Sequence, residues 1–152
     1  MKRFQFRLQK VLEYKEEIEK QRMHDLADAR EELARQVERY ERIQAVREEN
    51  TVSLSRKASE KEIHPDEIQA HLRYQRKLEA DLSEQNRRVA GAEAHTEKQR
   101  QILLEAAKER KTLETLKEQK LLTHRAESDR QERNFFDEVA TMRHHRGRDN
   151  HD

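Results

Sequence analysis

The chain has 152 residues, of which 43% are charged and only 32% hydrophobic, and its 33 Lys and Arg nearly balance 32 Asp and Glu. It contains two glycines, one proline and no cysteine. Large apolar residues are too few for a globular core, and turn residues are too few for a sandwich, a barrel or an α/β domain. The lack of cysteine excludes disulfides and thiolate metal sites.

High charge with low hydrophobicity is compatible with disorder or with long helices. Disordered chains are usually rich in Pro, Gly and Ser, whereas this chain consists mainly of Glu, Lys, Arg, Gln, Leu and Ala, which favour helix. Acids precede bases at a spacing of four, and each such pair stabilises a helix by about 0.2–0.5 kcal/mol. The pairs are Glu16/Lys20, Glu31/Arg35, Glu38/Arg42, Glu84/Arg88 and Asp129/Arg133. We therefore expect an all-α protein.

The pattern predicts a first helix over about 4–55. A helix this polar is stable only when it buries an apolar stripe against another helix. The stripe comprises Phe4, Leu8, Val11, Ile18, Leu26, Ala29, Leu33, Val37 and Tyr40, continued by Ile43 or Val46. Most steps are three, four or seven residues, as in a coiled-coil seam, but the step from Ile18 to Leu26 departs from the heptad.

A turn is predicted over about 56–65. The residues between Asn50 and Glu62 include valine, threonine and three serines, which are poorer helix formers than their surroundings. Pro65 follows, and proline suits the first position of a new helix. Asp66 and Glu67 then suit the positive end of the helix dipole.

A second helix is predicted from Pro65 to about Arg143. Its stripe comprises Ile68, Leu72, Leu78, Leu82, Val89, Ala92, Leu103, Ala106, Leu113 and Leu116, with polar seam positions at Gln75, Gln85, Thr96 and Gln99. A short connection between two long helices makes an antiparallel hairpin. We expect a single antiparallel coiled-coil domain over 1–143, with the second helix longer than the first, and a flexible tail over 144–152.

The sequence shows no catalytic constellation. Two glycines cannot form a phosphate-binding loop, and none of the eight histidines lies in a metal-binding motif. Carboxylates on a two-helix coil have no pocket that would desolvate them. We therefore expect no enzymatic activity, no cofactor and no metal, with a weak alternative metal site in the tail at His144, His145 and His151. The other helical histidines are expected on the surface, and they are His24, His71, His95 and His124.

Function is then expected from exposed side chains. Aromatic residues gather at the N-terminal end and at the far end of the second helix. Two compatible interpretations stay open: Phe4, Phe6 and Phe135 clamp the open end together, and these ends form a docking tip for another protein. Lys108–Arg125 carries six basic residues against three acidic ones, which is usual for a solvated face but would also suit an acidic protein or a phosphate backbone.

Three stretches form a recognisable arrangement over about 150 residues. The first is Phe4-x-Phe6-x-Leu8-x-x-Val11-Leu12-x-x-Lys15, the second is Leu113-Glu114-x-Leu116-Lys117-Glu118, and the third is Glu132-x-x-Phe135-x-Asp137-Glu138-Val139-Ala140. The arrangement resembles the FliJ family, a component of the bacterial flagellar type III protein export apparatus. The resemblance covers nearly the whole chain.

The resemblance implies a non-enzymatic stalk. Proteins of this family form an antiparallel coiled coil whose ends sit in the central hole of the hexameric export ATPase (FliI), where they promote assembly and hydrolysis. They also bind the cytoplasmic domain of the export gate protein FlhA and escort export chaperones. By resemblance we expect a cytoplasmic monomer at the cytoplasmic face of the inner membrane, without membrane insertion and without nucleic acid.

The resemblance also implies two sets of contact residues. The ATPase contacts are expected at Phe4, Phe6, Leu8, Val11, Lys15, Phe135, Phe136, Asp137, Glu138 and Val139. The export-gate contacts are expected at Ile43, Val46, Tyr74 and Leu78, for which seam packing near the turn is an equal alternative. Val46 and Asn50 stand where the family usually carries aromatic residues.

Three alternatives stay open at this point. The first is an injectisome-type secretion stalk, which has similar size and shape. The second is a generic structural coiled coil that dimerises along its length, although Pro65 disfavours one continuous helix. The third is a nucleic-acid binder, which the balanced charge disfavours.

Overall fold

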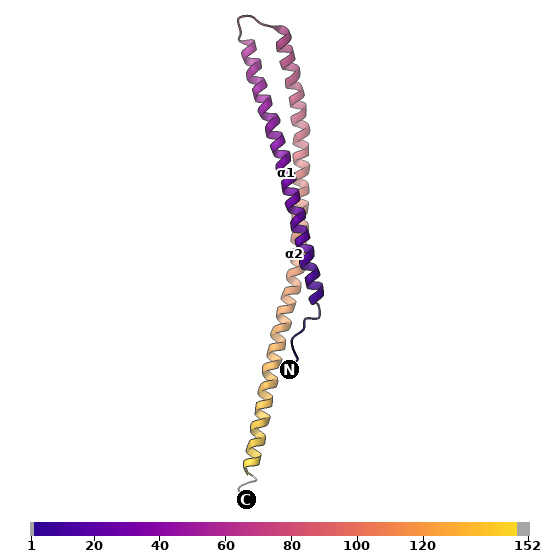
Figure 1. Cartoon of the computed structure of the whole chain (residues 1–152), viewed down its shortest axis with the longest axis vertical. Coiled ribbons are helices and arrows are strands. Elements are labelled where there is room, and N and C mark those ends of the chain that lie inside the picture. Colours follow the sequence, from indigo (N-terminus) through magenta and orange to yellow (C-terminus); the bar gives the residue numbers. More distant parts are fainter. Residues whose placement is uncertain (1, 149–152) are drawn as a thin grey trace. The chain divides into compact units, whose positions relative to one another are not determined.

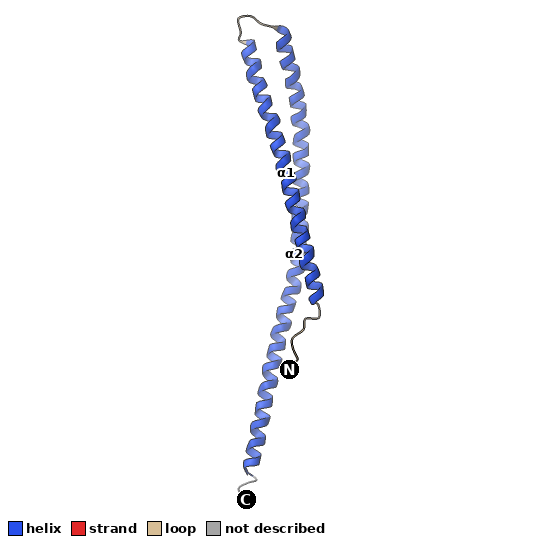
Figure 2. Ribbon diagram, in the orientation of Figure 1, coloured by secondary structure: helices blue, strands red, loops and turns tan. Residues whose placement is uncertain are grey.

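The computed structural model describes residues 2–148. Two helices, α1 (Gln9–Ala58, 50 residues) and α2 (Pro65–Arg148, 84 residues), account for almost all of them, and the described range contains no strand (Figures 1 and 2). The helices pack against each other in opposite directions, and the second is the longer. This confirms the predicted all-α antiparallel coiled-coil hairpin.

The chain divides into two compact units. The terminal unit comprises Met1–Glu19 and Ala106–Asp152, and the turn unit comprises Lys20–Glu105. Each unit contains a piece of both helices and is described by itself below.

The turn unit is held together by a thin apolar seam. Leu26 and Ala29 of α1 and Leu78 and Leu82 of α2 are all buried, with between 4% (Ala29) and 6% (Leu82) of their surface exposed. Burying one leucine side chain stabilises the fold by about 1.5–3 kcal/mol. These residues belong to the predicted stripes, because a spacing of three or four puts them on one helix face.

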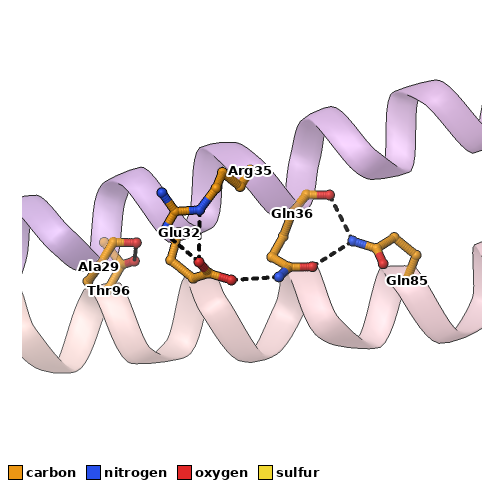
Figure 3. Close-up of polar contacts among 6 residues, drawn as sticks. All are labelled: Ala29, Glu32, Arg35, Gln36, Gln85 and Thr96. Carbon is orange, nitrogen blue, oxygen red and sulfur yellow. Dashed lines mark hydrogen bonds and ion pairs between the residues drawn. The ribbon is translucent and has the colours of Figure 1, made fainter.

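Polar side chains interrupt this seam and cross it with hydrogen bonds. Buried Gln85 donates to the backbone carbonyl of Gln36 at 2.9 Å and to its Oε1 at 2.8 Å. Within α1, Gln36 in turn donates to Glu32 at 2.6 Å. The Thr96 hydroxyl is shared between the Ala92 carbonyl of its own helix at 2.8 Å and, across the seam, the Ala29 carbonyl at 3.3 Å (Figure 3). Such bonds fix how the two helices are aligned, because each donor must meet its own acceptor.

The turn follows the local sequence closely. α1 ends at Ala58 with Arg56 and Lys57 in its last turn, and α2 begins at Pro65 with acids in its first turn. Both arrangements suit the helix dipole, and proline at the first position loses no hydrogen bond. An ion pair of 2.9 Å between Lys57 Nζ and Glu67 Oε2 joins the two helix ends across the turn.

The chain enters the terminal unit differently from the prediction. The first helix begins at Gln9 rather than near Phe4, and residues 2–6 are not helical. Exposure alternates there: Phe4, Phe6 and Leu8 are half-buried, and the residues between them are exposed. A period of two puts all three apolar side chains on one side of an extended chain, whereas a helix would separate Phe6 from the other two.

The seam of the terminal unit also differs at one position. Leu12 is buried, with 3% of its surface exposed, whereas Val11 is 42% exposed, so the prediction that Val11 lies in the stripe is wrong. The irregular step of eight residues from Ile18 to Leu26 explains this difference. It interrupts the heptad, so the positions of Leu26 and later residues do not fix which residue before Ile18 faces the other helix. Glu19, at 8% exposed, is the buried polar residue of this seam.

α2 extends further than predicted, to Arg148 rather than Arg143. His144, His145 and Arg146 are helical and exposed. A single glycine at position 147 costs a helix only about 1 kcal/mol and so does not force it to end. The remainder of the predicted tail, including His151, lies outside the described residues.

Candidate protein-interaction surfaces

The titratable groups are arranged as surface ion pairs rather than as a reactive site. The strongest shift lies at Glu97, where hydrogen bonds from Arg100 and Gln101 lower the pKa of the carboxyl from 4.5 to about 2. The pKa of Glu32 and Glu67 is lowered in the same way, by neighbouring donors. These shifts stabilise the charged forms of the three carboxyl groups. Among residues 2–148, no group of three or more His, Asp or Glu could hold a metal ion.

Residues 2–8 form a strap that precedes α1, here called the N-terminal strap. It lies against the α2 part of the terminal unit, where the Phe4 ring packs on the His124 ring with 5.5 Å between their centroids. His124 is therefore half-buried, and the expectation of a surface position for it is wrong. The alternation of Phe4, Phe6 and Leu8 in the sequence could have indicated this packing. In an extended chain the three apolar side chains lie on one side, and that side is buried against another element.

The next two predicted ATPase contacts lie on the first turns of α1. Val11 is exposed and free to meet a partner. Lys15 forms an ion pair of 2.7 Å with Glu109 of α2, and this hydrogen bond raises the pKa of the Lys15 amine. Lys15 therefore fastens α1 to α2 inside the terminal unit in addition to being reachable from solvent.

The second half of the predicted ATPase set forms an exposed group on α2. Phe135 is 61% exposed and Phe136 is 66% exposed, and their rings touch edge to face with 6.0 Å between centroids. Asp137 and Glu138 are exposed and Val139 is half-buried. Phe135 therefore does not clamp Phe4, whose ring partner is His124, and the clamp alternative is wrong in this part.

Met142 lies one helical turn beyond Val139 and is 65% exposed. We call Phe135, Phe136, Val139 and Met142 the C-terminal apolar patch. Large apolar residues at helical spacing, exposed together, are typical of a face that binds another protein.

The predicted gate contacts divide between seam and surface. Leu78 is buried at 5% exposed and Ile43 is half-buried, as the seam-packing alternative requires for these two. Val46 is 37% exposed and Tyr74 is 44% exposed. Only the last two present their side chains to a partner directly.

One buried polar cluster near the turn was missed by sequence reasoning. Asn50 is 6% exposed, and its amide donates to the His71 carbonyl at 3.1 Å and to Gln75 Oε1 at 2.8 Å. His71 Nδ1 lies 2.9 Å from Asn50 Oδ1, so His71 is a seam residue and not the surface residue expected. The signal was present, since Asn50 follows Ile43 by one heptad.

A second polar contact, in the terminal unit, was also missed. Glu19 is buried and accepts a hydrogen bond from Arg110 Nε, while Arg110 Nη1 donates to Glu114 at 2.6 Å. These two bonds, first to Glu114 and then to Glu19, raise the pKa of Arg110. A buried carboxylate in a seam is stable only with such a partner.

Taken together, these features define a class. The described residues form two packed helices whose distinctive side chains are exposed apolar and charged groups, so this is an antiparallel coiled-coil protein. No helix in residues 2–148 is long and apolar enough to cross a membrane.

Nearly the whole chain matches one known protein family. The family model described as flagellar FliJ protein matches residues 4–149. The chain therefore belongs to the FliJ family, which is part of flagellar protein export, a type III secretion process. No curated protein and no solved structure matches the sequence.

Proposed function

We propose that this protein is a non-enzymatic stalk of the flagellar export apparatus that binds the hexameric export ATPase (FliI) and promotes its assembly and activity. The observation that carries the proposal is the family match over residues 4–149, joined to a terminal unit with an exposed apolar patch. The expected contacts are the N-terminal strap with Val11 and Lys15 on one side, and Phe135 to Val139 on the other.

Stimulation follows from differential binding. A single two-helix coil has no sixfold symmetry, so it contacts the six subunits of a ring unequally. A partner shifts a conformational equilibrium only as far as it binds one state better than another. Unequal contacts therefore favour different states in different subunits, which is how a stalk without an active site increases hydrolysis.

The turn unit is proposed to bind the cytoplasmic domain of the gate protein FlhA. Val46 and Tyr74 are the exposed members of the predicted set, while Ile43 and Leu78 support them from the seam. Escort of export chaperones completes the proposed role. The site of action is the cytoplasmic face of the inner membrane, and the working form is a monomer.

The test is the rate of ATP hydrolysis by the purified ATPase of the same export system. The protein, added at one copy per six ATPase subunits or fewer, is expected to raise that rate and to promote ring formation. The injectisome ATPase serves as a matched control, which is expected to respond less. Absence of both stimulation and complex would contradict the proposal.

A further inference from the structure

A groove runs along the N-terminal strap. The strap and α2 enclose a hollow of about 860 Å³, whose walls include Phe4 and Phe6 from the strap and Lys120 from α2. A second hollow of about 750 Å³ shares the same strap residues and extends to Lys10 and Lys117. Residues 3–7 of the strap line both hollows, and we call the two hollows together the strap groove.

The strap groove is strongly basic, although the chain as a whole has a net charge of only +1. Two acids, Glu13 and Glu127, face six cations there. None of these six cations forms an ion pair within the described residues, whereas Lys15, close by, is paired with Glu109. The six are Lys2, Arg3, Arg7, Lys10, Lys117 and Lys120.

The strap also contributes apolar side chains to the groove and has backbone groups without backbone hydrogen bonds. Phe4 and Phe6 are half-buried in the groove wall. Within the described residues, the backbone of residues 2–5 makes no backbone hydrogen bond. An exposed, non-helical stretch of this kind can pair with another extended chain through its main-chain groups.

We propose that the strap groove binds an extended acidic segment of a partner protein. Carboxylates of the segment meet the unpaired cations, and its apolar side chains lie on the two phenylalanine rings. A nucleic acid fits less well, because base stacking needs a free ring face and the Phe4 ring is packed on His124, whereas an aliphatic side chain can contact the part of the ring that stays exposed. The strap is also an expected ATPase contact, so the inference deepens the proposed function by naming the chemistry of the ligand. The peptide assay below does not need the ATPase, so it can succeed or fail independently of the proposed function.

The experiment measures fluorescence anisotropy of a labelled peptide of about eight residues in which glutamate alternates with leucine. The full chain is expected to bind it, and binding is expected to weaken as salt rises, because exposed charges are screened within about 10 Å at 0.1 M. The double variant Arg3→Glu with Arg7→Glu is expected to lose about tenfold in affinity or more.

The matched control reverses two exposed cations of the turn unit, Arg30→Glu with Arg87→Glu, and so changes the net charge equally. It is expected to bind the peptide as the wild type does. Circular dichroism verifies that both variants keep their helix content. Equal loss in both variants would show a general charge effect and overturn the proposal.

Two further probes separate the occupants. A lysine–leucine peptide of the same length is expected not to bind. Vesicles containing an anionic phospholipid, and a single-stranded oligonucleotide, test the other polyanions. If either binds through Arg3 and Arg7 while the acidic peptide does not, the groove is not a peptide site and the inference is wrong.

Discussion

At the scale of single residues, the few polar groups buried in the thin seam have a large effect on the stability of the fold. Glu19 and Asn50 are buried in seams that have few buried apolar residues. A buried polar group is costly when it lacks a partner and nearly neutral when it has one, so each depends on the residues that it meets. Arg110 serves Glu19 in this way, and His71 and Gln75 serve Asn50.

Removal of Arg110 should therefore destabilise the terminal unit more than removal of an ordinary surface arginine. In Arg110→Ala, Glu19 keeps its burial but loses its donor, and we expect a loss of about 1–3 kcal/mol in the free energy of unfolding. Arg88→Ala breaks an exposed pair with Glu84 and should cost about 0.5 kcal/mol or less. Urea unfolding followed by circular dichroism measures both, and equal losses would contradict this view of Glu19.

Acid sensitivity at Glu97 gives a second test. Its pKa is lowered from 4.5 to about 2 in the folded state, so its contribution to stability is present above pH 4.5 and is lost as pH falls toward 2. In Glu97→Gln, the melting temperature should fall less between these pH values than in the wild type. Glu93→Gln, which alters an exposed acid without an ion pair in the described residues, is the control and should leave the slope unchanged.

At the scale of elements, most of the fold could be predicted because helix propensity, charge spacing and the single proline agree. Pro65 begins α2 as predicted, and Leu26, Ala29, Leu78 and Leu82 are in the seam. The strap was missed because a helical stripe explains Phe4 and Leu8 but leaves Phe6 unexplained. Leu12 was missed because the irregular step after Ile18 shifts the register.

The interaction surfaces could be predicted less well than the fold. A pattern of apolar residues shows which side chains favour burial. It does not show which of them the opposite helix buries and which stay exposed for a binding protein. Tyr74 is exposed and Leu78 is buried, although the two are one helical turn apart. That difference depends on where the opposite helix runs, which spacing within one helix does not contain.

At the Asn50 cluster, we expect lower stability of the α1–α2 pair to be accompanied by higher specificity of helix pairing. A single buried asparagine in a coiled coil fixes the register and oligomeric state at a cost in stability. Asn50→Leu should raise the free energy of unfolding by ~1 kcal/mol through apolar burial, and should also allow dimers to form. Asn86→Leu, at an exposed position of α2, should do neither.

Thermal melting and light scattering after gel filtration read out the two effects of Asn50→Leu. A variant that is both more stable and strictly monomeric would show that the hydrogen bonds to His71 and Gln75 do not specify the pairing.

At the scale of the whole molecule, the chain contains two compact units with different exposed residues. The terminal unit presents the C-terminal apolar patch, and the turn unit presents Val46 and Tyr74. If contacts are made locally by each unit, the proposed ATPase and gate activities should be separable by mutation. This separation is expected because substitutions at sites that share no partner usually act independently.

Two double variants test the separation. Phe135→Ala with Phe136→Ala should weaken binding to the export ATPase about tenfold or more, because exposed aromatic residues dominate such interfaces, and should leave gate binding intact. Val46→Ala with Tyr74→Ala should do the reverse. Helix content should hardly change in either, since all four side chains are exposed in the free protein. Leu122→Ala, which removes an equally exposed apolar side chain outside both sets, is the control for each assay. Loss of both activities in one variant, with its helix content preserved, would mean that the units act as one surface and that the division of contacts proposed for this stalk is wrong.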